Sequence, residues 1–277
     1  MSIFFNNCLV TLINCYNIVM NEGKKLSLYV ITKNSENTLE ACLKSVQGLA
    51  DEIIIVDSFS ADRTMEIAQK YGAKTFQRPF KNFQDQKQFA LDQCSCKWVL
   101  NLDADEELSP LLKQEISEII NSKVKEKLFF IPEQVTFLNR KMKYSGLTGK
   151  FHERLAYREG TKYTGGAVHE KLYNEGPKKY LKGYFYHTPY TSVEQYFEKF
   201  NRYTTLGAEK LFESGKKFKF FNLFRQPLDF IKIYFLRCGF MDGMQGFLWA
   251  WLSSTYPTVK YAKLWYLYFK DRKKSGK

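Results

Sequence analysis

Short apolar runs alternate with stretches of helical periodicity through the first half of the chain. Runs rich in β-forming residues predict strands at residues 26–31, 52–57, 74–77 and 97–102. Helices are predicted between and after them, at residues 38–46, 60–71, 83–93 and 109–121. The run at 52–57 is apolar until its last residue, which is typical of a parallel strand buried on both faces. We therefore expect a doubly wound α/β sheet, whose ligands bind beyond the carboxyl ends of its strands.

Polar side chains fall at those strand ends. Asn34 and Glu36 follow the first strand, Asp57 ends the second, and Asp103 with Asp105 follows the fourth. In an extended chain, residues two apart point to the same side, so both aspartates could converge on one hard cation. Capping of the following helix is the competing interpretation of this short motif. A ligand site at this edge of the sheet would explain all of the strand-end carboxylates together.

The second half of the chain has a different pattern. Short strands are predicted at residues 128–131, 134–138, 154–157 and 171–173, with glycine-rich turns between them. His169 and Glu170 lie among these strands, and adjacent residues of a regular strand cannot present both side chains to one point. We expect this pair at a bend. From Ser192 onward the apolar positions recur at helical spacing, continuing through 218–241 and 247–269.

Aromatic residues alternate with Lys and Arg throughout this helical region. One interpretation is a helical tail that packs its aromatic residues in a core and leaves basic faces in water. The other is an amphipathic platform at an anionic membrane, with Trp249, Trp251 and Trp265 at the level of the lipid headgroups. The sequence leaves both open.

Composition narrows the classes of partner. The chain has 277 residues, a formal net charge of +13 and 17 % aromatic residues, which suits an anionic lipid surface or a nucleic acid. No nucleic-acid-binding motif is present, so we expect no nucleic acid partner. The six cysteines form no C-x-x-C pair, which indicates reduced thiols in a cytosolic protein.

Neither of the two uncharged stretches of the chain, 1–21 and 243–259, has the pattern of a membrane-spanning helix. Residues 1–21 have no charged side chain, but they lack the basic start and cleavage site of a signal peptide. We expect residues 1–25 to be a poorly ordered extension, with Met20 as a second candidate start. Residues 243–259 are uncharged but contain polar residues and a proline, and are shorter than a span of about 20 residues.

Several motifs together resemble the inverting glycosyltransferases of family 2, and within them the bacterial lipopolysaccharide inner-core β-1,4-glucosyltransferases. The motifs that carry the resemblance are Thr32–Leu39, Val56–Thr64, Leu100–Leu108, Val168–Glu170, Tyr186–Tyr190, Arg237–Gly243 and Lys260–Leu264. The resemblance implies a GT-A fold, which is a Rossmann-like mixed sheet flanked by helices, followed by a C-terminal helical appendage. It implies a catalytic domain at 26–190, with a nucleotide-binding half at 26–122 and an acceptor half at 123–190, and a basic aromatic region at 191–277.

The resemblance also implies roles for the strand-end residues. Asp57 would contact the uracil or its ribose, with Thr32, Asn34 and Glu36 lining the same pocket. Many relatives have a second acidic residue directly after this aspartate, where the chain has Ser58. The finer contacts with the nucleotide therefore do not carry over.

The diphosphate and the metal form the next part of the implied site. Lys87 would lie near the diphosphate, Asp103 would approach the ribose and the metal, and Asp105 would bind Mg²⁺ or Mn²⁺. The cation would neutralise the charge that develops on the departing diphosphate.

An inverting transfer also needs a base that takes the proton of the acceptor hydroxyl. The resemblance assigns this role to Glu170, and His169 would touch the metal or the diphosphate. Arg154 and His187 are candidates for contact with the diphosphate or the acceptor. Surface exposure of Glu170 and simple packing of the histidines are the structural alternatives.

The expected function is transfer of a hexose, glucose from UDP-glucose, to a lipid-linked glycan such as the lipopolysaccharide inner core. The enzyme would be cytoplasmic and peripheral at the anionic inner face of the cytoplasmic membrane. The same chemistry on a capsule or protein glycan is one alternative. A non-catalytic protein that binds glycan or nucleic acid is another.

Overall fold

The computed structural model describes residues 23–165, 170–190 and 192–274. The chain divides into two compact units. The α/β unit contains the described residues up to Glu133 together with Phe151–His187, and the helical unit contains Gln134–Lys150 and the described residues from Thr188 onward. The candidate residues described below all belong to the α/β unit.

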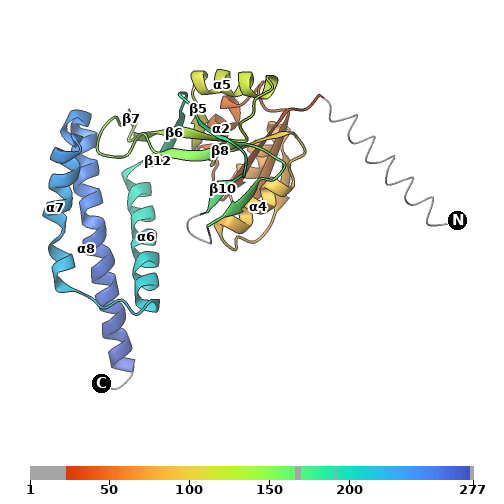
Figure 1. Cartoon of the computed structure of the whole chain (residues 1–277). Helices are drawn as coiled ribbons and strands as arrows, with labels where there is room; N and C mark the ends of the chain where they lie inside the picture. The colour runs from red at the N-terminus through yellow and green to blue at the C-terminus, as the bar shows by residue number, and fades with distance from the viewer. Residues whose placement is uncertain (1–22, 166–169, 191, 275–277) are drawn as a thin grey trace. The chain divides into compact units, whose positions relative to one another are not determined.

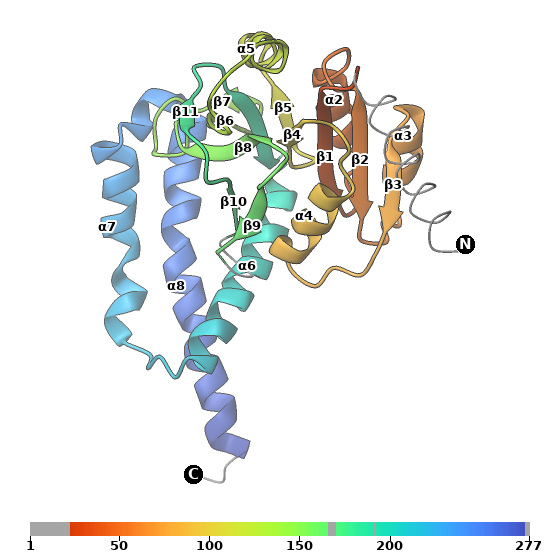
Figure 2. The same ribbon diagram turned by 45° about the vertical axis from the view of Figure 1, so that its right-hand side comes forward.

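Four parallel strands form the first part of the sheet, and mostly antiparallel pairs complete it (Figure 2). The parallel strands, in spatial order, are β3 (Lys74–Gln77), β2 (Glu52–Asp57), β1 (Leu26–Thr32) and β4 (Trp98–Asn101). The order continues through β8 (Phe151–Tyr157), β6 (Leu128–Phe137), β12 (Phe185–Tyr190) and β5 (Glu106–Leu108). Antiparallel pairing begins where β8 joins β4. The result confirms the mixed α/β sheet that the resemblance predicted.

Helices cover both faces of this sheet, because the central strands carry apolar side chains on both sides. Leu28 and Val30 of β1 belong to one core cluster with α2 (Leu39–Ser45), α3 (Thr64–Lys70) and α5 (Pro110–Asn121). Tyr29 points to the other cluster, which contains residues of α4 (Phe83–Asp92). This two-sided burial confirms the doubly wound arrangement inferred from the apolar run of the second strand.

Local signals place several helix ends. The Ser109 side chain accepts a hydrogen bond from the backbone N–H of Leu112, and Pro110 occupies the first turn of α5. Gly72 has φ +69° just after α3, the left-handed conformation of a C-terminal cap. The expected start of α3 at Ser60 was too early. Residues 60–63 form a turn whose backbone N–H groups bond to Asp57 and to Asn34 in the turn after β1, and the helix begins at Thr64.

The acceptor half differs from the prediction in its strands. Residues 128–131 and 134–138 were expected as two strands, but they form the single strand β6. Pro132 pairs with Phe151, the first residue of β8, so Pro132 stands at the end of the pairing between β6 and β8. A proline, which has no N–H to donate, is tolerated there, and β6 continues beyond it. Five strands were not predicted: β5, β7 (Arg140–Lys141), β9 (Lys162–Thr164), β11 (Lys178–Tyr180) and β12. The predicted strand at 171–173 is β10 (Lys171–Tyr173), which pairs with β9.

The helical unit is built on α6 (Val193–Glu213), α7 (Gln226–Ile231) and α8 (Gly243–Lys274), with α7 beside α8 (Figure 1). Residues 218–241 are largely helical, as their spacing predicts, but they form several short helices. That stretch contains η1 (Phe220–Phe224), α7, η2 (Lys232–Leu236) and η3 (Gly239–Asp242), and it breaks where Cys238 adopts the left-handed φ of 53°. Among residues 23–165, 170–190 and 192–274, no helix is both long and apolar enough to cross a membrane.

Candidate active site

The first part of the site is a carboxylate buried at the end of β2. Asp57 is 0 % exposed and pairs in register with Thr32 of the neighbouring strand β1. The Thr32 hydroxyl donates to Asp57 Oδ1 at 3.0 Å, and the Ser60 backbone N–H donates to Asp57 Oδ2 at 2.8 Å. These bonds hold the carboxylate at the carboxyl edge of the sheet, where the parallel order predicted a ligand.

The turn after β1 is bonded to the turn after β2. Asn34, in the left-handed conformation with φ 50°, accepts a hydrogen bond from the Ala61 N–H at 2.9 Å through its side-chain oxygen. Glu36 Oε2 accepts from the Arg63 N–H at 3.2 Å. The structure therefore brings Thr32, Asn34, Glu36 and Asp57 into one cluster.

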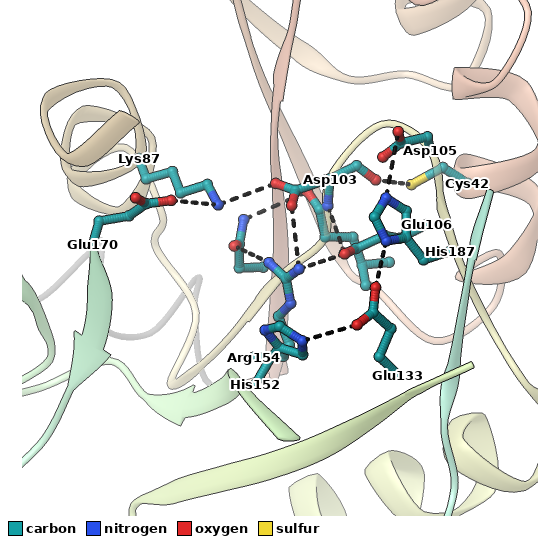
Figure 3. Close-up of polar contacts among 12 residues, drawn as sticks. Cys42, Lys87, Asp103, Asp105, Glu106, Glu133, His152, Arg154, Glu170 and His187 are labelled. Carbon is teal, nitrogen blue, oxygen red and sulfur yellow. Dashed lines mark hydrogen bonds and ion pairs between the residues drawn. The ribbon is translucent and has the colours of Figure 1, made fainter. Parts of the chain in front are cut away.

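The second part is centred on Asp103, which lies between two cationic side chains (Figure 3). Lys87 Nζ is 3.1 Å from Asp103 Oδ1, and an Arg154 guanidinium nitrogen is 3.2 Å from Oδ2. Loss of solvent would raise the pKa of Asp103, but Lys87 and Arg154 together hold it well below its usual range. Asp103 is thus an ionised carboxylate neutralised by protein cations.

Lys87 also reaches the candidate base. It comes from α4 and is 6 % exposed, and its Nζ lies 3.3 Å from Glu170 Oε1 (Figure 3). Burial would lower the pKa of Lys87, but Asp103 and Glu170 hold it above its usual value. Glu170 precedes β10, and its side chain is 16 % exposed, so it is not a surface charge. One buried ammonium therefore joins the strand-end aspartate to Glu170.

The third part is a row of side chains in which acids alternate with histidines, in the order Asp105, His187, Glu133 and His152. His187 Nε2 lies 3.6 Å from Asp105 Oδ2, while His187 Nδ1 bonds to Glu133 (Figure 3). The second oxygen of Glu133 lies 3.2 Å from His152 Nε2. Burial would lower the pKa of His187, but Asp105 and Glu133 raise it to about 10. Burial would raise the pKa of Glu133, but hydrogen bonds with His152 and His187 lower it to about 2.

The two aspartates do not share one orientation. The chain turns at Ala104 and Asp105 and is not extended there, so the side chains of Asp103 and Asp105 have different partners. The expectation that both converge from an extended chain was wrong for this reason. Asp105 faces His187, and Asp103 faces Lys87 and Arg154.

The side chains around Asp105 fit a divalent cation once His187 gives up the Nε2 proton that it carries in the metal-free site, because metals bind the neutral imidazole. A carboxylate oxygen and an imidazole nitrogen face each other, and Glu133 orients the imidazole from behind, as carboxylates commonly do for metal-binding histidines. Within residues 23–165, 170–190 and 192–274, no group of three or more His, Cys, Asp or Glu side chains could hold a metal by itself. Mg²⁺ in particular is commonly bound by one or two protein carboxylates and completed by substrate phosphates. His169, the third predicted ligand, lies outside the described residues.

Two acidic residues of this site were missed in the sequence. Glu106 is 1 % exposed, bonds to Arg154, and accepts from the Asp103 N–H at 2.9 Å. Glu133 is 8 % exposed and supports His187. A signal for Glu133 existed, because it interrupts an apolar strand directly after a proline. Glu106 sits in a run of four acidic residues among five, where nothing distinguishes a buried member from an exposed one.

Comparisons with known proteins identify the family of the chain. Residues 27–177 match the family model for glycosyl transferase family 2. The chain is 33 % identical over 261 residues to an uncharacterized glycosyltransferase of Rickettsia typhi, covering 90 % of this chain and 89 % of that protein. It is 30 % identical over 248 residues to the lipopolysaccharide core biosynthesis glycosyltransferase LpsC of Rhizobium meliloti, covering 87 % and 92 %.

Solved structures give weaker similarities. Residues 1–349 of S. aureus TarS in complex with UDP-GlcNAc align with a TM-score of 0.46 at 16 % identity, over 83 % of this chain and 79 % of that chain. Glucosyl-3-phosphoglycerate synthase of Mycobacterium tuberculosis, in complex with Mn²⁺, UDP and glucosyl-3-phosphoglycerate, aligns with a TM-score of 0.35 at 21 % identity, over 50 % and 58 %. The family match and the sequence relatives decide the assignment: the chain belongs to glycosyltransferase family 2.

Proposed function

We propose that this family 2 glycosyltransferase is an inverting, metal-dependent enzyme that transfers glucose from UDP-glucose to a lipid-linked glycan. The observation that carries the proposal is the Lys87 bridge, with Nζ 3.1 Å from Asp103 and 3.3 Å from Glu170. A buried cation between a donor-side acid and a second carboxylate matches a reaction that moves a sugar from a diphosphate to a hydroxyl. Lys87 supplies positive charge where the diphosphate binds, and Glu170 is the carboxylate where the proton of the acceptor leaves.

The donor occupies the carboxyl edge of the parallel strands. Asp57 receives the uracil or ribose, with Thr32, Asn34 and Glu36 beside it, and Asp103 lies next to the ribose. Lys87 and Arg154 are buried cations adjacent to Asp103, so they stabilise the negative charge of the diphosphate. The bound sugar then has its anomeric carbon on the side of Glu170.

Transfer forms one bond and breaks another at that carbon. The acceptor oxygen attacks the face opposite UDP, and Glu170 takes the proton of the acceptor hydroxyl as the new carbon–oxygen bond forms. The bond to the diphosphate breaks, and UDP leaves with the electron pair. Attack from the opposite face inverts the anomeric configuration. Lys87 contributes by stabilising the leaving group while its contact with Glu170 holds that carboxylate in place.

Asp105 and His187 would hold the cation, Mg²⁺ or Mn²⁺, and Glu133 fixes the orientation of His187. When bound, the cation would neutralise charge on the diphosphate. The role of His187 thereby moves from the predicted contact with the diphosphate or acceptor to the metal. His169 remains a predicted contact of the metal or diphosphate.

The acceptor that best fits is a glycan of the lipopolysaccharide inner core, because the LpsC relative is described as a lipopolysaccharide core transferase and spans nearly the whole chain. Such an acceptor is anchored in lipid. The enzyme then works in the cytoplasm, peripherally at the inner face of the cytoplasmic membrane.

A panel of nucleotide sugars tests the donor. In the presence of Mn²⁺, UDP-glucose should raise the unfolding temperature and should support transfer of radiolabelled glucose to glycan from a strain that lacks the protein. The proposal fails if another nucleotide sugar is the substrate, or if the isolated glycan accepts no sugar. Glycan mass from that strain should be lower by one hexose.

A further inference from the structure

The helical unit exposes an apolar stripe on the segment that runs along α8. Residues 220–236 form a nearly continuous helical run, since Arg225 and Lys232, which join η1, α7 and η2, both have right-handed helical backbone angles. One row of this run has spacings of three and four residues, which places its members on one face. We call this row the outer stripe; it consists of Phe221, Phe224, Leu228, Ile231 and Phe235.

The opposite face of the same run is already occupied. The Phe230 ring lies 5.9 Å from the Phe247 ring and 6.0 Å from the Trp251 ring of α8, and the Tyr234 ring lies 5.8 Å from that of Phe247. The run therefore has its own packing partner inside the unit, as α7 and α8 show side by side (Figure 1). The outer stripe is not needed for that contact.

The outer stripe is strongly exposed, from 47 % at Ile231 to 70 % at Phe221. Its neighbours Phe220 and Leu236 are exposed to 66 % and 76 %. Isolated apolar residues are common on protein surfaces, but a continuous row of phenylalanine, leucine and isoleucine marks an interaction site.

Charge identifies the kind of surface that the stripe fits. Residues 216–237 contain six Lys or Arg and one acidic residue, a net charge of +5. That one acid, Asp229, is paired with Arg225 at 3.1 Å. Lysine is depleted in protein interfaces, and two copies meeting through this face would bring like charges together. An anionic bilayer attracts the cations and accepts the apolar side chains at once.

We propose that residues 220–236 dock this protein on an anionic phospholipid bilayer, with the outer stripe inserted among the lipid chains and the flanking lysines at the headgroups. The run lies in the plane of the membrane, in keeping with the absence of a spanning helix among residues 23–165, 170–190 and 192–274. This site deepens the membrane location within the proposed function. It lies on a different segment from the tryptophan platform considered from the sequence, of which Trp249 packs against the core cluster of the helical unit while Trp251 and Trp265 are 51 % and 50 % exposed.

The test is binding of the full chain to vesicles of phosphatidylcholine with about 30 % phosphatidylglycerol, measured by co-sedimentation. Pure phosphatidylcholine vesicles should bind much more weakly, and added salt should weaken binding to the anionic ones. Binding that ignores lipid charge, or is absent from anionic vesicles, overturns the proposal.

Two paired variants locate the site. Phe224→Ser with Phe235→Ser should weaken binding at least about tenfold. Lys219→Gln with Lys232→Gln should weaken it by about 25-fold, from about fivefold per charge. The matched controls are Leu111→Ser, an apolar residue 49 % exposed on α5, and Lys123→Gln with Lys125→Gln after that helix. The controls should bind as the parent does.

Folding and assembly are measured on the same samples. All variants should retain the parent's unfolding temperature, because the substituted side chains are exposed. Unchanged vesicle binding by the Phe224/Phe235 variant overturns the proposal. Conversion of a parent dimer to a monomer by that variant, without loss of vesicle binding, assigns the stripe to a second copy instead. Vesicle binding needs neither donor nor acceptor, so its outcome is separate from that of the proposed transfer reaction.

Discussion

Replacement of Lys87 by glutamine separates its role in folding from its role at the diphosphate. Removing one partner of a buried ion pair costs about 3–5 kcal/mol. Asp103 is 34 % exposed and keeps Arg154 at 3.2 Å, so we expect a smaller loss of about 2–3 kcal/mol for Lys87→Gln. This loss is measurable as a lower unfolding temperature.

The same variant should bind UDP more weakly. A hydrogen bond from a charged donor contributes about 1.5–3 kcal/mol, so the dissociation constant of UDP should rise about ten- to a hundredfold. Isothermal titration at a temperature where the variant is folded measures this directly. Lys87→Arg keeps the charge and should recover part of the affinity. Lys97→Gln, an exposed lysine at the opposite end of β4, is the control and should change neither quantity.

The two readouts together can refute the reasoning. If Lys87→Gln lowers stability but leaves UDP affinity unchanged, Lys87 only neutralises Asp103 and does not reach the diphosphate. If stability is unchanged, the ion pairs at 3.1 and 3.3 Å contribute nothing in solution.

Two further predictions concern the acid and histidine chain. The pKa of His187 is raised to about 10 from 6.5, so above about pH 6.5 the folded protein keeps a proton that the unfolded chain loses, and the metal-free protein should lose stability as the pH rises toward 10. His187→Asn should flatten this dependence in denaturant titrations at several pH values, and an equally steep loss in the variant would contradict it. Asp105→Asn should abolish the extra thermal protection that Mn²⁺ gives to the UDP complex, without changing the fold. Retention of that Mn²⁺ effect would remove Asp105 from the metal site.

The sheet and its ligand edge follow from the sequence because they depend on local patterns. The apolar run before Asp57 predicts a two-sided parallel strand, and in the structure Thr32 of the neighbouring strand pairs with Asp57 at the same edge. The cluster of Thr32, Asn34, Glu36 and Asp57 could be located for the same reason. The carboxyl ends of parallel strands lie at one edge of the sheet, whatever conformation the connecting loops adopt.

The rest of the site depends on long-range contacts that no local pattern encodes. Glu133 and His187 are 54 residues apart in the sequence, and their bond forms only because β6 and β12 are neighbours in the sheet. Asp103 and Asp105 were predicted to act together because the chain was taken as extended, whereas a turn separates their directions. The break at Cys238 requires a left-handed residue that is not glycine, which hydrophobic periodicity cannot reveal.

The outer stripe could not be predicted from the sequence. Aromatic residues at helical spacing predict a helix but not which of its faces is covered. Phe230 and Phe235 are equivalent in the sequence pattern, yet the first packs on α8 and the second is 55 % exposed. Only the packing of the run against α8 distinguishes them.

The central claim is that Glu170 is the base of the transfer, and turnover of Glu170→Gln tests it most directly. With UDP-glucose, Mn²⁺ and the isolated acceptor glycan, kcat should fall about 10²- to 10⁴-fold while UDP affinity stays close to that of the parent. Glu175→Gln, an exposed carboxylate after β10, should leave kcat unchanged. A kcat within about tenfold of the parent, or a loss of UDP affinity equal to the loss of turnover, would contradict the account.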